Sequence, residues 1–274
     1  TTRARLILPV ETAVPGTTIL AGLELQMKDK WHTYWRNPGE IGATTTIEWE
    51  LPPGFSAGDI QWPVPEKYLF MDTYNYVYHK TAILLIPVTI APDTQPGTYQ
   101  LKARASWIEC EELCVPGNKT VSASLTIGPE GKLSSDADRI DQAKSKLPLS
   151  SENIRASIRW ESSETGKTRS FLIEWNVGDI PAPNPDFFPY ELNDMDVLPQ
   201  TEVVNNENGT VVLRKSITKF KGDWPEKLSG LLLPDISKKQ DATAYEVDLP
   251  SAAHHRELQS AAAPHPARCP RRNP

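Results

Sequence analysis

The chain has 274 residues, 39% hydrophobic and 23% charged, which is enough for one large globular domain or two ordinary ones. Its 29 basic and 35 acidic residues give a formal net charge of -6, so the average field repels a phosphate backbone and nucleic acid is not expected as a partner. The 25 prolines argue against a helical bundle, because an interior proline costs about 3 kcal/mol of helix stability. No apolar run approaches the roughly 18 residues of a membrane span.

The first 130 residues alternate between apolar and polar side chains, which is the pattern of strands with one face in a core. Turn signals such as Pro15-Gly16 and Pro96-Gly97 separate the strands. About seven short strands of this kind predict an immunoglobulin-like sandwich over residues 1–130. The clearest segments are 6–10, 19–27, 45–51, 82–90, 99–107 and 121–127. The aromatic stretch 68–78 lies between Pro65 and a predicted strand, where we expect a loop.

Residues 131–150 predict a linker that contains a short helix, because the segment 135–146 begins with acidic residues, ends with basic residues and precedes Pro148. Alternation resumes at 154–160 and predicts a second, smaller β-sandwich over residues 151–250. Residues 251–274 are rich in Ala, His, Pro and Arg, so we expect a disordered tail in which Cys269 is an incidental free thiol. The predicted fold class is all-β, with two tandem immunoglobulin-like β-sandwich domains, a short helical linker and a disordered C-terminal tail.

Cys110 and Cys114 stand in the segment WIECEELCVPGNKT. In one extended strand their Cα atoms would be about 13 Å apart, beyond the roughly 7 Å limit of a disulfide. A hairpin loop made of the three residues between them would place the cysteines opposite each other, at about 4.5 to 5.5 Å. A local disulfide is therefore geometrically available.

Such a disulfide could serve as a structural staple, as a redox centre or, when reduced, as part of a copper site. A staple that closes so short a loop contributes only about 2 kcal/mol, so exchange chemistry is the better explanation. A binuclear copper site on a β-sandwich would need a histidine and a methionine where Asn118 and Val121 stand. His32 and His79 remain as ligands that could approach in the fold. Glu109, Glu111 and Glu112 surround the pair and disfavour thiolates, which predicts poor spontaneous nucleophiles.

The sequence resembles the periplasmic amino-terminal region of DsbD-type thiol:disulfide interchange proteins, in particular the branch with two tandem β-domains that includes the suppressor-of-copper-sensitivity proteins. The resemblance covers about residues 1 to 248. It rests on five stretches: WHTYWRNPGEIGATTTIEW (31–49), IQWPVPEKY (60–68), YNYVYHKTAILLIPV (74–88), WIECEELCVPGNKTVS (107–122) and DFFPYE (186–191).

This resemblance implies a protein-disulfide reductase module in the bacterial periplasm, tethered to the inner membrane in the full-length architecture and free of cofactors and metals. Its implied partners are a membrane-embedded DsbD-type electron donor domain and periplasmic thioredoxin-fold proteins. Cytochrome c biogenesis and copper tolerance are associated expectations. Because neither the membrane helices nor the thioredoxin domain of the family follows residue 249, the chain is expected to be a fragment, a truncated product or a stand-alone module.

Carried over by position, Cys110 and Cys114 match the redox pair, and Cys114 matches the cysteine that forms mixed disulfides. The stretch 68–78 matches a cap loop that shields the pair, with Phe70 and Tyr74 as the expected caps. We interpret Trp31, Tyr34 and Trp35 as packing residues. The second domain is expected to be a spacer or a docking module.

Overall fold

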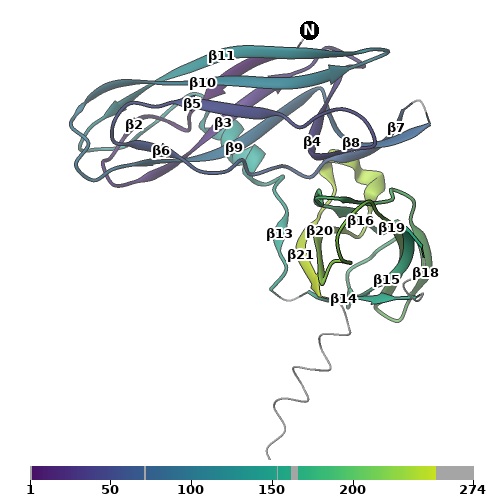
Figure 1. The fold of residues 1–274 in the computed structure, drawn as a ribbon. Helices are drawn as coiled ribbons and strands as arrows, with labels where there is room; N and C mark the ends of the chain where they lie inside the picture. Colours follow the sequence, from purple (N-terminus) through teal and green to yellow (C-terminus); the bar gives the residue numbers. More distant parts are fainter. Residues whose placement is uncertain (1, 71, 153, 162–165, 251–274) are drawn as a thin grey trace, which may run out of the picture.

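The computed structural model describes residues 2–70, 72–152, 154–161 and 166–250. Within these ranges the chain forms four β-sheets in two tandem sandwich-like units, which confirms the predicted all-β class (Figure 1). The expectations of a disordered tail and of a free Cys269 thiol fall on residues 251–274, outside the described residues.

The first unit pairs a four-stranded sheet with an eight-stranded sheet. The smaller sheet has the order β1 (Arg3–Ile7), β3 (Thr18–Gln26), β9 (Thr81–Ile90), β6 (Phe55–Ala57). The larger sheet has the order β12 (Lys132–Leu133), β2 (Val10–Ala13), β11 (Cys114–Ile127), β10 (Gly97–Cys110), β4 (His32–Gly39), β8 (Thr73–His79), β7 (Glu66–Phe70), and β5 (Thr46–Glu50) also pairs with β10.

The second unit pairs a four-stranded sheet with a five-stranded sheet. The first of these has the order β13 (Leu149–Ser150), β21 (Tyr245–Pro250), β20 (Lys227–Leu233), β16 (Asp186–Pro189). The other has the order β14 (Arg155–Trp160), β15 (Thr168–Asn176), β19 (Thr210–Lys219), β17 (Met195–Val197), with β18 (Glu202–Glu207) also paired to β19. A 3-10 helix, η1 (Ile236–Asp241), precedes β21.

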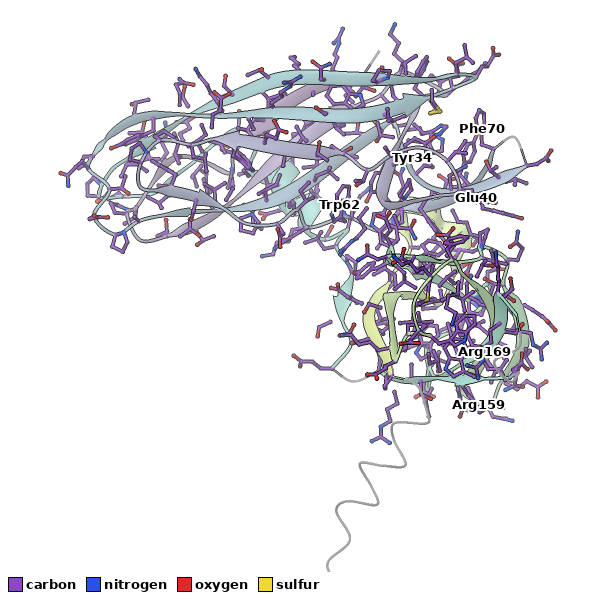
Figure 2. All side chains as sticks on the ribbon, in the orientation of Figure 1. Tyr34, Glu40, Trp62, Phe70, Arg159 and Arg169 are labelled. Carbon is purple, nitrogen blue, oxygen red and sulfur yellow. A yellow bond between two sulfur atoms is a disulfide. The ribbon has the colours of Figure 1, made fainter. Side chains whose placement is uncertain are left out.

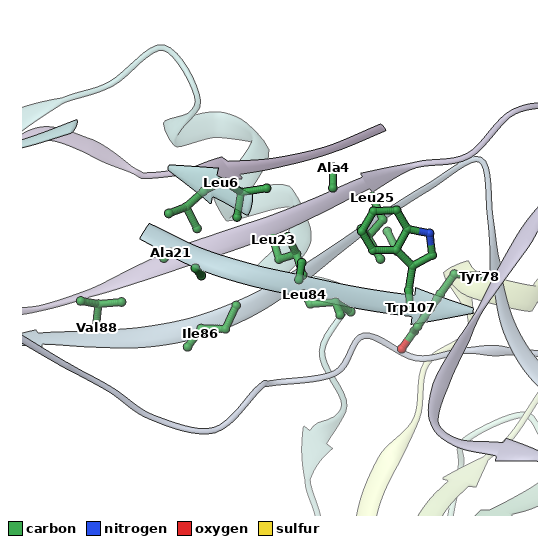
Figure 3. Close-up of a cluster of buried hydrophobic side chains, with 14 of the residues drawn as sticks. Ala4, Leu6, Ala21, Leu23, Leu25, Tyr78, Leu84, Ile86, Val88 and Trp107 are labelled. Atoms are coloured by element: carbon green, nitrogen blue, oxygen red, sulfur yellow. The ribbon is translucent and has the colours of Figure 1, made fainter. Parts of the chain in front are cut away.

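The main core lies between the two sheets of the first unit, where alternate residues of β3, β9 and β10 meet (Figure 3). Leu84 and Ile86 of β9 face this core, whereas Leu85 packs against Ile140 of helix α1 (Ala137–Lys144). Because β9 is covered on both faces, its sequence is a nearly continuous apolar run. The linker helix is thus packed onto the first unit. No helix among the described residues is both long and apolar enough to traverse a bilayer.

The two units share part of one core. Phe188, Leu231 and Leu233 of the second unit belong to the cluster that fills the first unit. The ring of Phe188 lies 4.7 Å from that of Tyr76 in β8. In Figure 1 the second unit accordingly lies against the end of the first unit that carries β4, β8 and β7. The second unit is therefore in direct apolar contact with the first.

Sequence patterns missed two segments of this end. The stretch expected to be a loop is a β-hairpin, because β7 pairs with β8 in a register that brings Phe70 opposite Thr73. The aromatic residues occupy every second position of each strand, so those of β7 share one face of the hairpin and those of β8 share the other. Strand β4 was not predicted because His32, Thr33, Tyr34 and Trp35 are all buried and show no alternation.

Candidate functional site

The two cysteines close the far end of the long β10–β11 hairpin. Each of these strands has 14 residues, and the last paired residues are Cys110 and Cys114. The two form a disulfide with a Cα–Cα distance of 4.1 Å, as the hairpin spacing predicts. Cys110 is fully buried, whereas Cys114 is exposed at the tip. An external thiol or disulfide can therefore approach Cys114 directly, but not Cys110.

Tyr34 of β4 contacts both sulfur atoms. Its hydroxyl donates a hydrogen bond to Cys110 Sγ at 3.0 Å and lies 3.7 Å from Cys114 Sγ. Burial raises the pKa of Tyr34 to about 12, so the phenol keeps its proton at neutral pH. Tyr34 packs with Val77 and Cys110, as interpreted from the sequence, and its hydroxyl in addition donates to the Cys110 sulfur. Trp35, its neighbour, does pack in the core.

His32 lies directly opposite Cys110 in the pairing of β4 with β10. Its ring is fully buried and meets four aromatic neighbours edge-on or tilted, with centroids 5.3 to 5.6 Å away. These neighbours are Tyr34, Tyr68, Phe70 and His79. Burial first, and then the proximity of His79, lower the pKa of His32 to about 4 against an opposing effect of Glu66, so the imidazole is neutral at pH 7.

Phe70 belongs to this aromatic cluster, but Tyr74 does not. Phe70 stacks on Tyr68 and reaches His32, and Figure 2 shows it near Tyr34 at one end of the first unit. Tyr74 lies beneath the ammonium group of Lys67 and lines a hollow of about 140 Å³ between the two units. The structure therefore brings one of the two expected cap residues to the redox pair and places the other at the boundary with the second unit.

The second unit contacts the β7–β8 hairpin through polar side chains. Lys67 Nζ donates to Asp186 Oδ2 at 2.7 Å, and Lys239 Nζ lies 2.9 Å from Glu66 Oε1. The side chain of Gln240 also bonds the backbone of His79 in both directions, at 3.1 and 3.3 Å. Three separate polar contacts thus fix the hairpin that carries the aromatic cluster.

The acidic residues beside the disulfide differ in exposure. Glu109 is buried and has interactions of its own, Glu111 is half-buried, and Glu112 is exposed at the tip. Since successive strand residues face opposite sides, the Glu109 side chain points away from that of Cys110. Only the two loop glutamates therefore remain as charges beside the exposed sulfur.

The structure brings the two histidines of the copper hypothesis together but shows no complete set of copper ligands among the described residues. The rings of His32 and His79 are 5.5 Å apart, as that hypothesis requires. Among the described residues, however, no group of three or more His, Cys, Asp and Glu side chains is arranged to hold a metal ion.

Sequence reasoning missed Tyr34, His32 and Tyr68 as members of the site. Two period-two pairs carried the available signal: His32 with Tyr34, and Tyr68 with Phe70. Each pair puts two aromatic side chains on one face of a strand. No local pattern shows that both faces meet at Cys110.

Comparison with known proteins supports a redox assignment for the first unit. Residues 4–126 match the family described as thiol:disulfide interchange protein DsbD, N-terminal. A search of curated proteins found no match. The fold is similar to the crystal structure of the N-terminal periplasmic domain of ScsB from Proteus mirabilis, with a TM-score of 0.65 and 18% identity over 91% of this chain and 93% of that one.

The family match spans the strands that carry the disulfide hairpin and the aromatic cluster, and the structural match extends over both units. The first unit of this chain belongs to the family of N-terminal domains of the thiol:disulfide interchange protein DsbD.

Proposed function

We propose that the chain is a periplasmic thiol:disulfide exchange module that accepts electrons from a membrane-embedded DsbD-type domain and reduces disulfides in thioredoxin-fold proteins. The observation that carries this proposal is the asymmetry of the disulfide, which joins a buried and an exposed cysteine paired across the end of a hairpin. An exchange centre needs one sulfur open to attack and a second that resolves the intermediate.

The position of the disulfide argues against a purely structural role. Cys110 and Cys114 are already held opposite each other by the β10–β11 ladder, so the bond adds little constraint to the folded chain. The loop it closes is so short that chain entropy gives about 2 kcal/mol.

The exchange reaction assigns a different task to each cysteine. In the reduced module the Cys114 thiolate attacks one sulfur of the partner's disulfide, a Cys114–partner bond forms, and the second partner sulfur leaves as a thiolate. Cys110 then attacks Cys114 Sγ, the internal disulfide forms, and the first partner sulfur leaves. Two electrons and two protons pass to the partner, which becomes a dithiol. The reverse sequence, with a donor dithiol, recharges the module.

Phe70 is the proposed cap of this centre. It lies on the strand at the edge of the sheet, with its ring against His32 and Tyr68, on the face that includes Cys110. A ring there limits access of small oxidants until a partner displaces it, a gating role that loops and hairpins commonly perform. Tyr74 is assigned a supporting place at the opposite face of the hairpin.

Two cysteine variants test the assignment of roles. Cys110→Ser should accumulate a mixed disulfide with a thioredoxin-fold protein that presents a disulfide, because the resolving thiol is gone, whereas Cys114→Ser should trap none. The adducts are counted by mass spectrometry under non-reducing conditions. Equal trapping by both variants would void the assignment.

A redox titration separates exchange from the staple. The wild-type protein, equilibrated with mixtures of reduced and oxidised dithiothreitol or glutathione, should pass reversibly between disulfide and dithiol in a two-electron transition while it stays folded. Unfolding that accompanies reduction would identify a structural disulfide. A copper absorption band on addition of Cu(I) or Cu(II) to the dithiol would favour a copper-binding site.

A further inference from the structure

Packing explains why a ring stands at position 32, but in the disulfide form it does not explain why that ring is an imidazole. Neither Nδ1 nor Nε2 finds a hydrogen-bond partner among the described residues, although the whole side chain is buried. A neutral imidazole always carries one N–H donor and one acceptor nitrogen. Leaving such groups unsatisfied in a buried place is unfavourable, and an apolar ring of the same size would avoid that cost.

The position of His32 indicates which group completes its hydrogen bonding. His32 and Cys110 are directly opposite across β4 and β10, and side chains so paired have Cβ atoms about 4.5 to 5.5 Å apart. The buried cysteine acquires a proton, or a negative charge, only when the disulfide is reduced. Tyr34 already donates to this sulfur, so a second group beside it can act as an acceptor.

We propose that His32 is the proton acceptor for Cys110, so that the imidazole and the Cys110 thiol form a pair that exists only in the reduced protein. This inference rests on the proposed exchange function. In the resolving step the Cys110 S–H proton passes to the neutral imidazole, the Cys110–Cys114 bond forms with the electron pair of the Cys110 thiolate, and the partner sulfur leaves. The imidazolium then returns its proton to that leaving thiolate, directly or through water. In the recharging direction the same proton travels back to Cys110.

The surroundings of the imidazole suit a base that gives up its proton again once the disulfide has formed. The titratable groups that face it are Cys110 on β10, His79 on β8, Tyr68 and Glu66 on β7, and Tyr34 on its own strand. Glu66 is engaged by Lys239 and His79, and its favourable effect on an imidazolium at His32 is outweighed by burial and by His79. Once the disulfide has formed, burial again favours the neutral ring.

Tyr34 is not suited to accept the Cys110 proton. Its hydroxyl is a donor to the sulfur, and a phenol with a pKa of about 12 holds its proton far more tightly than a thiol. The acidic loop residues lie at the exposed tip rather than beside the buried sulfur. His32 is thus the described group that combines an acceptor atom with a position opposite Cys110.

The test uses the reduced protein and the aromatic disulfide dithiobis(nitrobenzoate) in a stopped-flow absorbance experiment. Attack by Cys114 releases the first nitrothiobenzoate, and closure by Cys110 releases the second. We expect His32→Phe to leave the first phase unchanged and to slow the second by about 100-fold at pH 7, the usual size of general-base assistance. Cys110→Ser identifies the second phase because it abolishes that phase in either background.

The pH profile distinguishes proton transfer from a change in packing. In the wild type the second phase should be nearly flat from about pH 6 to 8, whereas in His32→Phe it should rise about tenfold per pH unit, because the thiol must then lose its proton to solvent. The Phe ring keeps the edge-on contacts and should leave the melting temperature of the oxidised protein unchanged or higher. A second phase with the same rate and pH profile in both proteins overturns the inference alone. A wild type that shows no second phase overturns the proposed exchange function and the inference together.

Discussion

At the scale of single residues, we expect the Tyr34 hydroxyl to influence how easily the buried sulfur leaves. A hydrogen bond to a charged sulfur contributes about 1.5–3 kcal/mol, and this donor stands 3.0 Å from Cys110 Sγ. During reduction of the disulfide Cys110 departs as a thiolate, so the bond strengthens as the reaction proceeds.

We predict that Tyr34→Phe slows reduction of the disulfide by dithiothreitol by about tenfold, which corresponds to about 1.4 kcal/mol of activation free energy. Stopped-flow or quench measurements of remaining disulfide give the rate. Tyr76→Phe is the matched control, because the Tyr76 hydroxyl is also buried but has no hydrogen-bond partner within the described residues. A rate loss of equal size in both variants would assign the effect to packing.

At the scale of elements, the two faces of the β7–β8 hairpin contact different parts of the molecule. Phe70 and Tyr68 face the redox pair through His32, while Lys67 and Tyr74 face the second unit. Alternation along a strand produces this division without any special loop.

We predict that Phe70→Ala accelerates reduction of the disulfide by a small reductant by about an order of magnitude, equal to roughly 1.4 kcal/mol of activation free energy. Because the ring is only half-buried, the loss of unfolding free energy should stay well below the roughly 3–5 kcal/mol of a core phenylalanine. Leu69→Ala is the control: Leu69 is the preceding residue of the same strand, is 54% exposed and points to the other face. If Phe70→Ala lowers the melting temperature and leaves the reduction rate untouched, the ring is packing and the cap proposal fails.

Sequence patterns captured the strands that have one covered face and the apolar run of β9, but they missed β4 and the β7–β8 hairpin. The β10 and β11 alternation located the cysteines at a hairpin end, and the loop length predicted their pairing. Strand β4 shows no alternation of apolar and polar residues, because one face packs in the core through Trp35 and the other against Cys110 through Tyr34. The contact between Tyr34 and Cys110 joins residues 76 positions apart, and no local pattern encodes it.

At the scale of the whole molecule, a buried ionic cluster joins the second unit to the β7–β8 hairpin. Asp186 accepts from Lys67 of β7 and lies 3.5 Å from Lys215 Nζ of β19, with all three side chains largely or fully removed from solvent. Burial opposes ionisation of Asp186, but Lys215 and Lys67 outweigh it and lower the pKa of the carboxyl below its ordinary value. The stability contributed by this depressed pKa is present above the ordinary carboxyl pKa and is lost as the pH falls through the folded value.

We predict that Asp186→Asn lowers the unfolding free energy by about 3–5 kcal/mol, because it leaves two buried ammonium groups without their counter-ion. The same variant should speed reduction of the disulfide, although residue 186 lies in the other unit, since β7 loses its anchor. Urea denaturation and the dithiothreitol assay measure the two effects. Asp248→Asn removes an exposed pair with Lys227 and should change the unfolding free energy by less than about 1 kcal/mol and the rate not at all. An Asp186→Asn protein that is destabilised but reduced at the wild-type rate would mean that the cap does not depend on the second unit.

The place of the disulfide, at the end of a ladder that holds both cysteines in register, has a consequence for the energetics of the redox cycle. By thermodynamic linkage, the difference in unfolding free energy between the oxidised and the reduced protein is proportional to the difference in reduction potential between the folded and the unfolded chain. A loop this short limits the chain-entropy part of that difference to about 2 kcal/mol, or about 45 mV for a two-electron couple. Chain entropy therefore shifts the potential only slightly, and we expect the groups around the sulfurs to set the rest: the Tyr34 hydroxyl, the His32 ring and the two loop glutamates. Exchange of those few side chains would retune the driving force of electron transfer while the two units stay folded in both redox states.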